Sequence, residues 1–148
     1  MIEARLVGRH ISSFADVLGF TVVVPDRFPE GDPEYGMDRY IEYPDRGFTI
    51  LVNSADVCSC VQFFDGRKEP DYEQYAGTFP YGLTFDSSRT DVRSAMGVPV
   101  YWLEDARFDF PPPILPWDWF AHDGVKIHFE YSETKDRVVM VSVMPLPE

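Results

Sequence analysis

Residues 82–99 read GLTFDSSRTDVRSAMGVP, and this stretch decides the fold that the sequence predicts. Ser88 is placed to cap a helix, and Asp91 stands three residues later, where a capping box has its acid. Apolar residues then recur at helical spacing. Gly97 and Pro99 end the segment, because glycine favours helix C-termini and proline cannot continue a helix. The stretch therefore predicts one short amphipathic helix.

Short strands are predicted after this helix, and a similar order of elements is found earlier in the chain. Alternating apolar residues, separated by turn-forming residues, predict strands over 117–120, 125–131 and 138–144. In the first half, a helical pattern over 13–19 is followed by a β-branched run over 21–24 and a Pro- and acid-rich connection over 25–36. Three more strands are predicted after it, over 38–44, 47–52 and 57–64.

The two halves align as an internal repeat. The helix-ending Gly19 and Gly97 lie 78 residues apart, and the turn glycines Gly47 and Gly124 lie 77 apart. A repeat fixes architecture, because each unit alone buries too little apolar surface. We therefore expect an α+β fold of two tandem units, each a short helix followed by an antiparallel β-meander. The units would cover residues 1–66 and 82–148, with a linker over 67–81, in one compact globule.

The segment 82–99 and the strands after it resemble the helix-plus-sheet unit of the SmpA/BamE lipoproteins. The matching positions are Gly82-Leu83, Val92, Gly97 and Pro99. Two such units in tandem are similar to the architecture of the β-lactamase inhibitory proteins. The resemblance implies a binding scaffold and carries no activity signature. The sequence departs from both families, since it has no lipid-attachment cysteine at its start, no export signal and no suitably paired cysteines.

The strong negative charge narrows the classes of partner. The formal net charge is −12 and the sequence pI is about 4.5. A free-standing nucleic-acid binder needs a basic surface, and an anionic membrane would repel this chain. An acidic, aromatic-rich surface suits a basic protein. Short acidic proteins of this kind also resemble bacterial immunity proteins, so we expect a non-enzymatic inhibitor that binds and neutralises a cognate toxin, with no cofactor.

The start of the sequence and its two cysteines favour a cytoplasmic protein. No secretion signal and no apolar run long enough to span a bilayer are present. Cys58 and Cys60 lie two apart in a strand-like run, so we expect them to share one face and not to bridge each other. They are predicted to be reduced core thiols. The three histidines have no metal-ligand spacing, so no metal site is expected.

The candidate partner-binding residues come from two segments in which aromatic and acidic residues alternate. This composition is typical of interface hot spots for a basic partner. The residues are Asp71, Tyr72, Glu73 and Tyr75 from the first segment, and Trp102, Glu104, Asp105, Phe108 and Asp109 from the second. Trp117 and Trp119 are left open between core and surface, and so is the oligomeric state.

Two other functions are open at this stage. His128 and Glu130 lie on one face of the strand over 125–131, and a histidine beside a carboxylate can serve acid–base catalysis. A small enzyme would need a concave pocket around this face. The SmpA/BamE resemblance implies the other alternative, an adaptor in envelope assembly, for which a lipid anchor would be expected.

Overall fold

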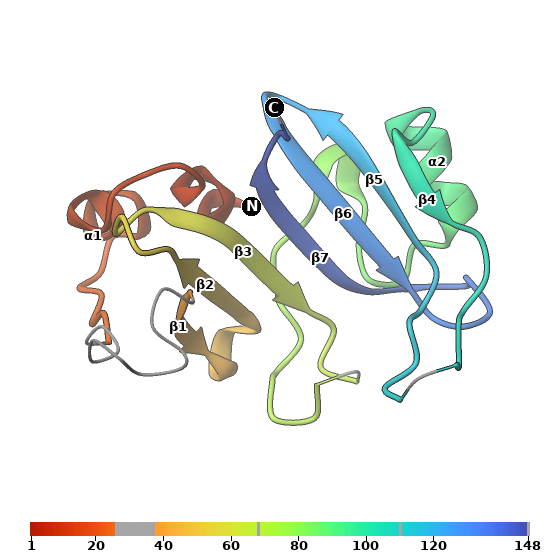
Figure 1. The fold of residues 1–148 in the computed structure, drawn as a ribbon, viewed down its shortest axis with the longest axis horizontal. Helices are drawn as coiled ribbons and strands as arrows, with labels where there is room; N and C mark the ends of the chain where they lie inside the picture. Colours follow the sequence, from red (N-terminus) through yellow and green to blue (C-terminus); the bar gives the residue numbers. More distant parts are fainter. Residues whose placement is uncertain (26–37, 68, 110, 148) are drawn as a thin grey trace.

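The computed structural model describes residues 1–25, 38–67, 69–109 and 111–147, and within them the chain forms one seven-stranded sheet (Figure 1). The strand order is β1-β2-β3-β7-β6-β5-β4, and all neighbouring strands are antiparallel. The strands are β1 (Arg39–Tyr43), β2 (Phe48–Val52), β3 (Cys58–Phe64), β4 (Tyr101–Leu103), β5 (Trp117–His122), β6 (Val125–Tyr131) and β7 (Val138–Pro145).

The helices are short and differ in how well they are formed. The described residues contain two α-helices, α1 (Phe14–Leu18) and α2 (Arg89–Met96). The remaining helical segments are single 3-10 turns or little more: η1 (Ile2–Leu6), η2 (Ile11–Ser13), η3 (Pro44–Arg46) and η4 (Pro80–Gly82). Within the described chain, no helix has the length and apolar character needed to cross a membrane.

Helix α2 forms as its sequence predicts. The side chain of Ser88 accepts a hydrogen bond from the backbone N–H of Asp91, and the Asp91 carboxylate accepts one from the backbone N–H of Ser88. This capping box satisfies two of the N–H groups that a helix start leaves without partners. Gly97, at φ 90°, ends the helix. The capping and the end of this helix are thus confirmed.

The predicted fold class, two tandem helix-plus-meander units, is wrong. The seven strands form one continuous sheet, because β3 pairs with β7, for example Val61 with Val143. Helix α1 has only five residues, and Ser13, the residue before it, makes no side-chain hydrogen bond to it. Five residues are about one and a half turns, too few for a helix that could cover a sheet of its own. Among the described residues, α2 is therefore the one helix of more than two turns, and it lies beside a single sheet.

Two local features differ from what the sequence pattern alone indicates. The β-branched run over 21–24 forms no strand, and the three-residue strand β4 lies where no strand was predicted. β-Branched residues favour strands only where a neighbour offers hydrogen bonds, and residues 21–24 pair with no strand in the described structure. Most of the connection predicted over 25–36 lies outside the described residues.

The core lies on one face of the sheet. The alternating residues of each strand divide between two faces, and the helices place their buried side chains against only one of them. The core cluster includes Leu6, Phe14, Ile50, Val52, Phe63, Val92, Phe120, Ile127, Phe129, Tyr131, Val141 and Val143. Leu6, Phe14 and Val92 come from η1, α1 and α2. In Figure 1, α2 lies behind the β4 edge of the sheet.

A bulge in the pairing of β2 with β3 separates the two cysteines. Cys58 pairs with Val52 and belongs to the core, whereas Cys60 pairs with Leu51, so the two thiols lie on opposite faces. The expectation of a shared face is therefore wrong. Both cysteines are buried and free, as predicted. Burial raises the pKa of both thiols to about 12, which makes them poor nucleophiles.

Candidate binding surface

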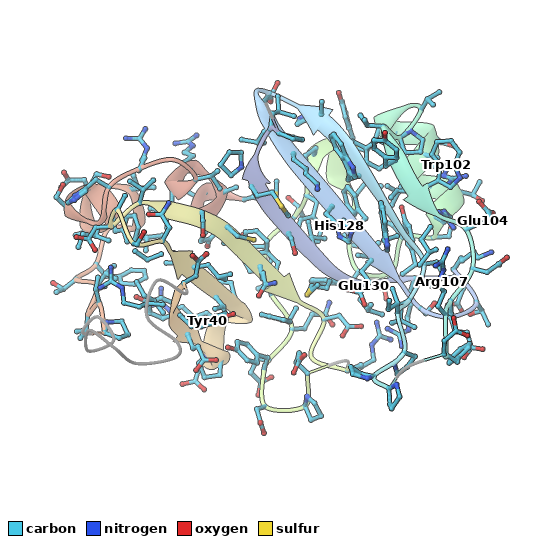
Figure 2. The ribbon with its side chains drawn as sticks, in the orientation of Figure 1. Tyr40, Trp102, Glu104, Arg107, His128 and Glu130 are labelled. Atoms are coloured by element: carbon cyan, nitrogen blue, oxygen red, sulfur yellow. The ribbon has the colours of Figure 1, made fainter. Side chains whose placement is uncertain are left out.

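The face of the sheet opposite the core forms a broad surface, called here the open face. On β6 the core-facing residues alternate with Lys126, His128 and Glu130, which point to the other side. Figure 2 shows His128 and Glu130 near the middle of the sheet and Tyr40 toward its β1 edge. By strand register, the open face comprises Tyr40, Glu42, Thr49, Leu51, Cys60, Gln62, Phe64, Tyr101, Leu103, Trp117, Trp119, Ala121, Lys126, His128, Glu130, Met140, Ser142 and Met144.

Aromatic side chains line the open face on β4 and β5. The rings of Tyr101 and Trp119 lie 6.2 Å apart, and Lys126 places its ammonium 4.8 Å from the centre of the Trp119 ring. The Trp117 ring lies 5.1 Å from the imidazole of His128. Tyr101, at the sheet edge, is 65% exposed, whereas Trp119 is buried by its neighbours. The neighbouring rings and the ammonium thus hold the tryptophans in place and leave Tyr101 available for contact.

Tyr72 packs on the other end of the same face. Its ring lies 4.5 Å from the Phe64 ring. Its hydroxyl lies 2.7 Å from the Thr49 hydroxyl and donates a hydrogen bond of 3.1 Å to Glu42. Burial raises the pKa of Tyr72 above its ordinary value. The loop after β3 therefore returns over the β1–β3 end of the open face.

Acidic loops meet at the end of the sheet where β3 and β6 finish. Asp65 accepts a hydrogen bond of 2.6 Å from Arg137, and Asp105 accepts one of 2.7 Å from Lys135. Arg137 and Lys135 belong to the turn between β6 and β7, so this turn is tied to the loops on both sides. The hydrogen bond from Lys135 lowers the pKa of Asp105 below its usual range. These two carboxylates therefore already have cationic partners within the chain.

The predicted partner-binding residues divide into several places. Tyr72 lies on the open face, whereas Tyr75 is buried in the core and donates a hydrogen bond of 2.7 Å to Glu3. Trp102 faces the α2 side of β4, because it pairs with the core-facing Asp118. The others are exposed in loops, with Asp71 and Glu73 in one and Glu104, Asp105, Phe108 and Asp109 in another. The structure thus does not gather the predicted residues on one surface.

A buried charge network is the main feature that sequence reasoning missed. Asp118 is fully buried and accepts two hydrogen bonds each from Arg89 and Arg93. It also accepts one of 2.8 Å from the Tyr131 hydroxyl. Burial alone would raise the pKa of Asp118, but the hydrogen bonds from Arg93, Arg89 and Tyr131 hold it below its ordinary value. The network attaches α2 to the sheet.

One signal for this network is present in the sequence. Asp118 stands between two tryptophans in a strand, at the position that alternation assigns to the core face. An acid at a core position requires a buried cation as its partner. Arg89 and Arg93 of α2 could supply this cation, because they lie four residues apart and so share one face of the helix.

The described residues contain no cluster of three histidine, cysteine, aspartate or glutamate side chains that could hold a metal ion.

His128 and Glu130, the pair proposed for acid–base chemistry, lie side by side on the open face, and both are half-buried. The imidazole of His128 packs against Trp117. Packing against Trp117 is therefore enough to explain the position of the His128 imidazole.

The sequence matches none of the family models and none of the curated proteins with which it was compared. Solved structures do match. An extracellular protein containing an SCP domain, from Bacillus anthracis, aligns with a TM-score of 0.60 and 8% identity over 95% of this chain and 44% of that protein. A DUF4309 family protein from Bacillus subtilis aligns with a TM-score of 0.52 and 12% identity over 95% of this chain and 81% of the other.

These likenesses concern the fold alone, because the identities are low. The chain spans less than half the length of the SCP-domain protein. The resemblance to the SmpA/BamE and β-lactamase inhibitory proteins is wrong, since the structural neighbours are SCP-domain and DUF4309 proteins and the strands form one sheet. The chain is similar in fold to these bacterial proteins.

Proposed function

We propose that this chain is a non-enzymatic protein-binding module that holds a positively charged protein against the open face of its sheet. The observation that carries the proposal is the aromatic lining of that face, where Tyr101, Trp117 and Trp119 are held in place by ring and cation contacts. Aromatic side chains that are fixed before binding lose little conformational entropy when a partner arrives.

The charge of the chain supports a basic partner. The net charge of −12 creates a negative potential that speeds the approach of a cationic protein. Exposed acids, including Asp71, Glu73 and Asp109, lie in the loops at one end of the sheet. Contact energy would come from the aromatic residues, and the association rate would come from the charge. Neutralisation of a toxin is the narrower form of this proposal and remains a prediction.

The structure affects the two alternative functions, the adaptor and the small enzyme, in different ways. The adaptor in envelope assembly was implied by the SmpA/BamE resemblance and loses its basis with it. The small enzyme remains a prediction, and it requires a pocket that brings a substrate to His128 and Glu130 together. Replacing His128 by Gln tests it, because such an enzyme would lose its activity while binding of a protein partner on the rest of the face would persist.

Affinity capture with matched variants tests the proposal. Tyr40, 53% exposed, and Tyr101 are the exposed aromatics at opposite edges of the open face. Tyr81, 70% exposed, contacts His122 on the core side of the sheet and serves as the control. The wild-type chain is expected to capture one basic protein in stoichiometric amount. Tyr101→Ala is expected to weaken binding about 30-fold, as for a hot-spot residue worth about 2 kcal/mol, and Tyr40→Ala to weaken it less.

The Tyr81→Ala control and the salt dependence of the association rate show whether the partner binds the open face. Tyr81→Ala should bind the captured protein like the wild type, and the association rate should fall steeply as salt is added. Binding that survives both open-face substitutions but is lost with Tyr81→Ala would place the interface elsewhere. If the captured protein has an enzymatic activity, adding the chain should abolish it; undiminished activity in the complex would refute the toxin-neutralising form.

A further inference from the structure

A pocket lies between the end of α2 and strand β4, on the side of the sheet opposite the open face. It has a volume of about 470 Å³ and is lined by Arg93, Gly97, Val98, Pro99 and Trp102. This volume falls within the range of small-molecule sites. The walls are mostly apolar, and a single charged side chain, that of Arg93, contributes to the described lining.

The local sequence explains why the space is open. Gly97 ends α2 at φ 90°, and a Cβ built at this position would meet no other atom within 4 Å. Pro99 then prevents a further helical turn, so the chain moves away from the helix axis toward β4. Val98 is 88% exposed, and the indole of Trp102 is half exposed. Apolar groups thus line a space that is open to solvent and that no side chain of the described residues fills.

The charges behind the pocket do not balance. Arg89 and Arg93 supply two positive charges to the buried network, and Asp118 supplies one negative charge. Arg89 directs its remaining N–H groups to backbone carbonyls of Leu103, Glu104 and Trp117. The two guanidinium groups therefore exceed the Asp118 carboxylate by one positive charge, and Arg93, 33% exposed, is the more accessible of the two.

Arg93 is the residue through which a ligand could reach this excess charge. Its Nε and Nη2 bind Asp118 at 3.0 and 2.7 Å, whereas its Nη1 has no acceptor among the described residues. The nearest other carboxylate, that of Glu104, lies 4.0 Å from Nη2 and is well exposed to water. A guanidinium bound along one edge keeps its other N–H groups directed elsewhere, here beside apolar walls.

We propose that this pocket binds a small amphipathic monocarboxylate, an organic acid with one carboxylate and an apolar body. The carboxylate accepts hydrogen bonds from Nη1 of Arg93, and the apolar body lies against Trp102, Val98 and Pro99. The ligand adds a second negative charge next to the two guanidinium groups of Arg89 and Arg93. This inference does not depend on the proposed protein partner, because the pocket lies away from the open face.

Titration of the purified chain with three six-carbon probes tests the inference. Hexanoate, hexanol and hexylamine share an apolar body and differ in the polar end. Amide and indole N–H signals in nitrogen–proton NMR spectra report where each probe binds. Hexanoate should shift the signals of Gly97, Val98 and Trp102, and it should bind about tenfold more tightly than hexanol, as expected for a charge-assisted hydrogen bond.

Two charge-matched variants show whether the site is this pocket. Val98→Glu places a negative charge at the mouth of the pocket and should abolish the shifts caused by hexanoate. Val23→Glu makes the same change at a position 81% exposed in the first half of the chain and should leave them intact. The inference is overturned by equal or tighter binding of hexanol or hexylamine. Shifts at other residues, or no shifts with hexanoate at high millimolar concentration, would overturn it too.

Discussion

The substitution Asp118→Asn should destabilise this protein severely. Asp118 accepts five hydrogen bonds, two from Arg89, two from Arg93 and one from Tyr131. An asparagine keeps one oxygen but turns an NH₂ group toward these donors, and it removes the buried counter-charge that the two guanidinium groups share. Breaking a buried ion pair costs about 3–5 kcal/mol. For a chain of this size, that corresponds to a fall in melting temperature of roughly 6–20 °C.

Thermal unfolding followed by circular dichroism measures this effect, with Asp105→Asn as the matched control. Asp105 also binds a cation, Lys135, at 2.7 Å, but its carboxylate is exposed to water. The two variants change the net charge equally, so global charge cancels in the comparison. We expect Asp105→Asn to melt close to the wild type. Equal melting temperatures for the two variants would refute the conclusion that the buried network attaches α2 to the sheet.

The Asp118 carboxylate also makes the stability of the fold depend on pH. The pKa of Asp118 is lowered in the folded state, so the unfolded chain binds the proton more readily. Its contribution is therefore complete above the ordinary aspartate pKa of about 3.9 and is lost as the pH falls through the lower folded value. Between pH 4 and pH 2 the wild type should lose stability more steeply than Asp118→Asn. Parallel curves would contradict this assignment.

Three other perturbations have expected outcomes. A Cβ at Gly47 would lie 2.4 Å from the backbone oxygen of Glu73, so Gly47→Ala should lower the melting temperature more than Gly124→Ala, where φ is also positive but space is free. Cys58 and Cys60, with pKa values of about 12, should react with iodoacetamide at pH 8 only after unfolding, as mass spectrometry would show. Burial raises the pKa of Tyr131, so stability measured by denaturant titration should fall as the pH rises above about 10.

Local features of this fold could be predicted from the sequence, because they depend on neighbouring residues. The capping box of α2 needs only Ser88 and Asp91, three positions apart. Strands β2, β3, β6 and β7 follow from alternation and from the turns that flank them. The positions of six of the seven strands were therefore predicted to within a few residues, all except the short β4.

The arrangement of the strands could not be predicted in the same way. Val61 pairs with Val143, 82 positions further along the chain, and a row of backbone hydrogen-bonding groups does not specify which strand it will meet. The bulge that separates Cys58 from Cys60 depends on the partner strand β2 and leaves no mark in the local sequence.

The candidate site shows the same limit. Aromatic and acidic residues were recognised as a group, but only the fold decides that Tyr72 packs on the open face while Tyr75 is buried. The loop that carries both passes around the end of the sheet. Composition also could not show that Asp105 is bound by Lys135, because the two residues meet only through the packing of loop and turn.

The pairing of β3 with β7 has a consequence for synthesis on the ribosome. Strand β7 lies between β3 and β6, yet of these three it leaves the exit tunnel last. Until residues 138–145 emerge, β3 and β6 each present an unpaired edge, and unpaired edges invite pairing with other nascent chains. The two halves of the sheet can therefore join only after β7 has emerged, and the pairing of this one strand then covers both edges.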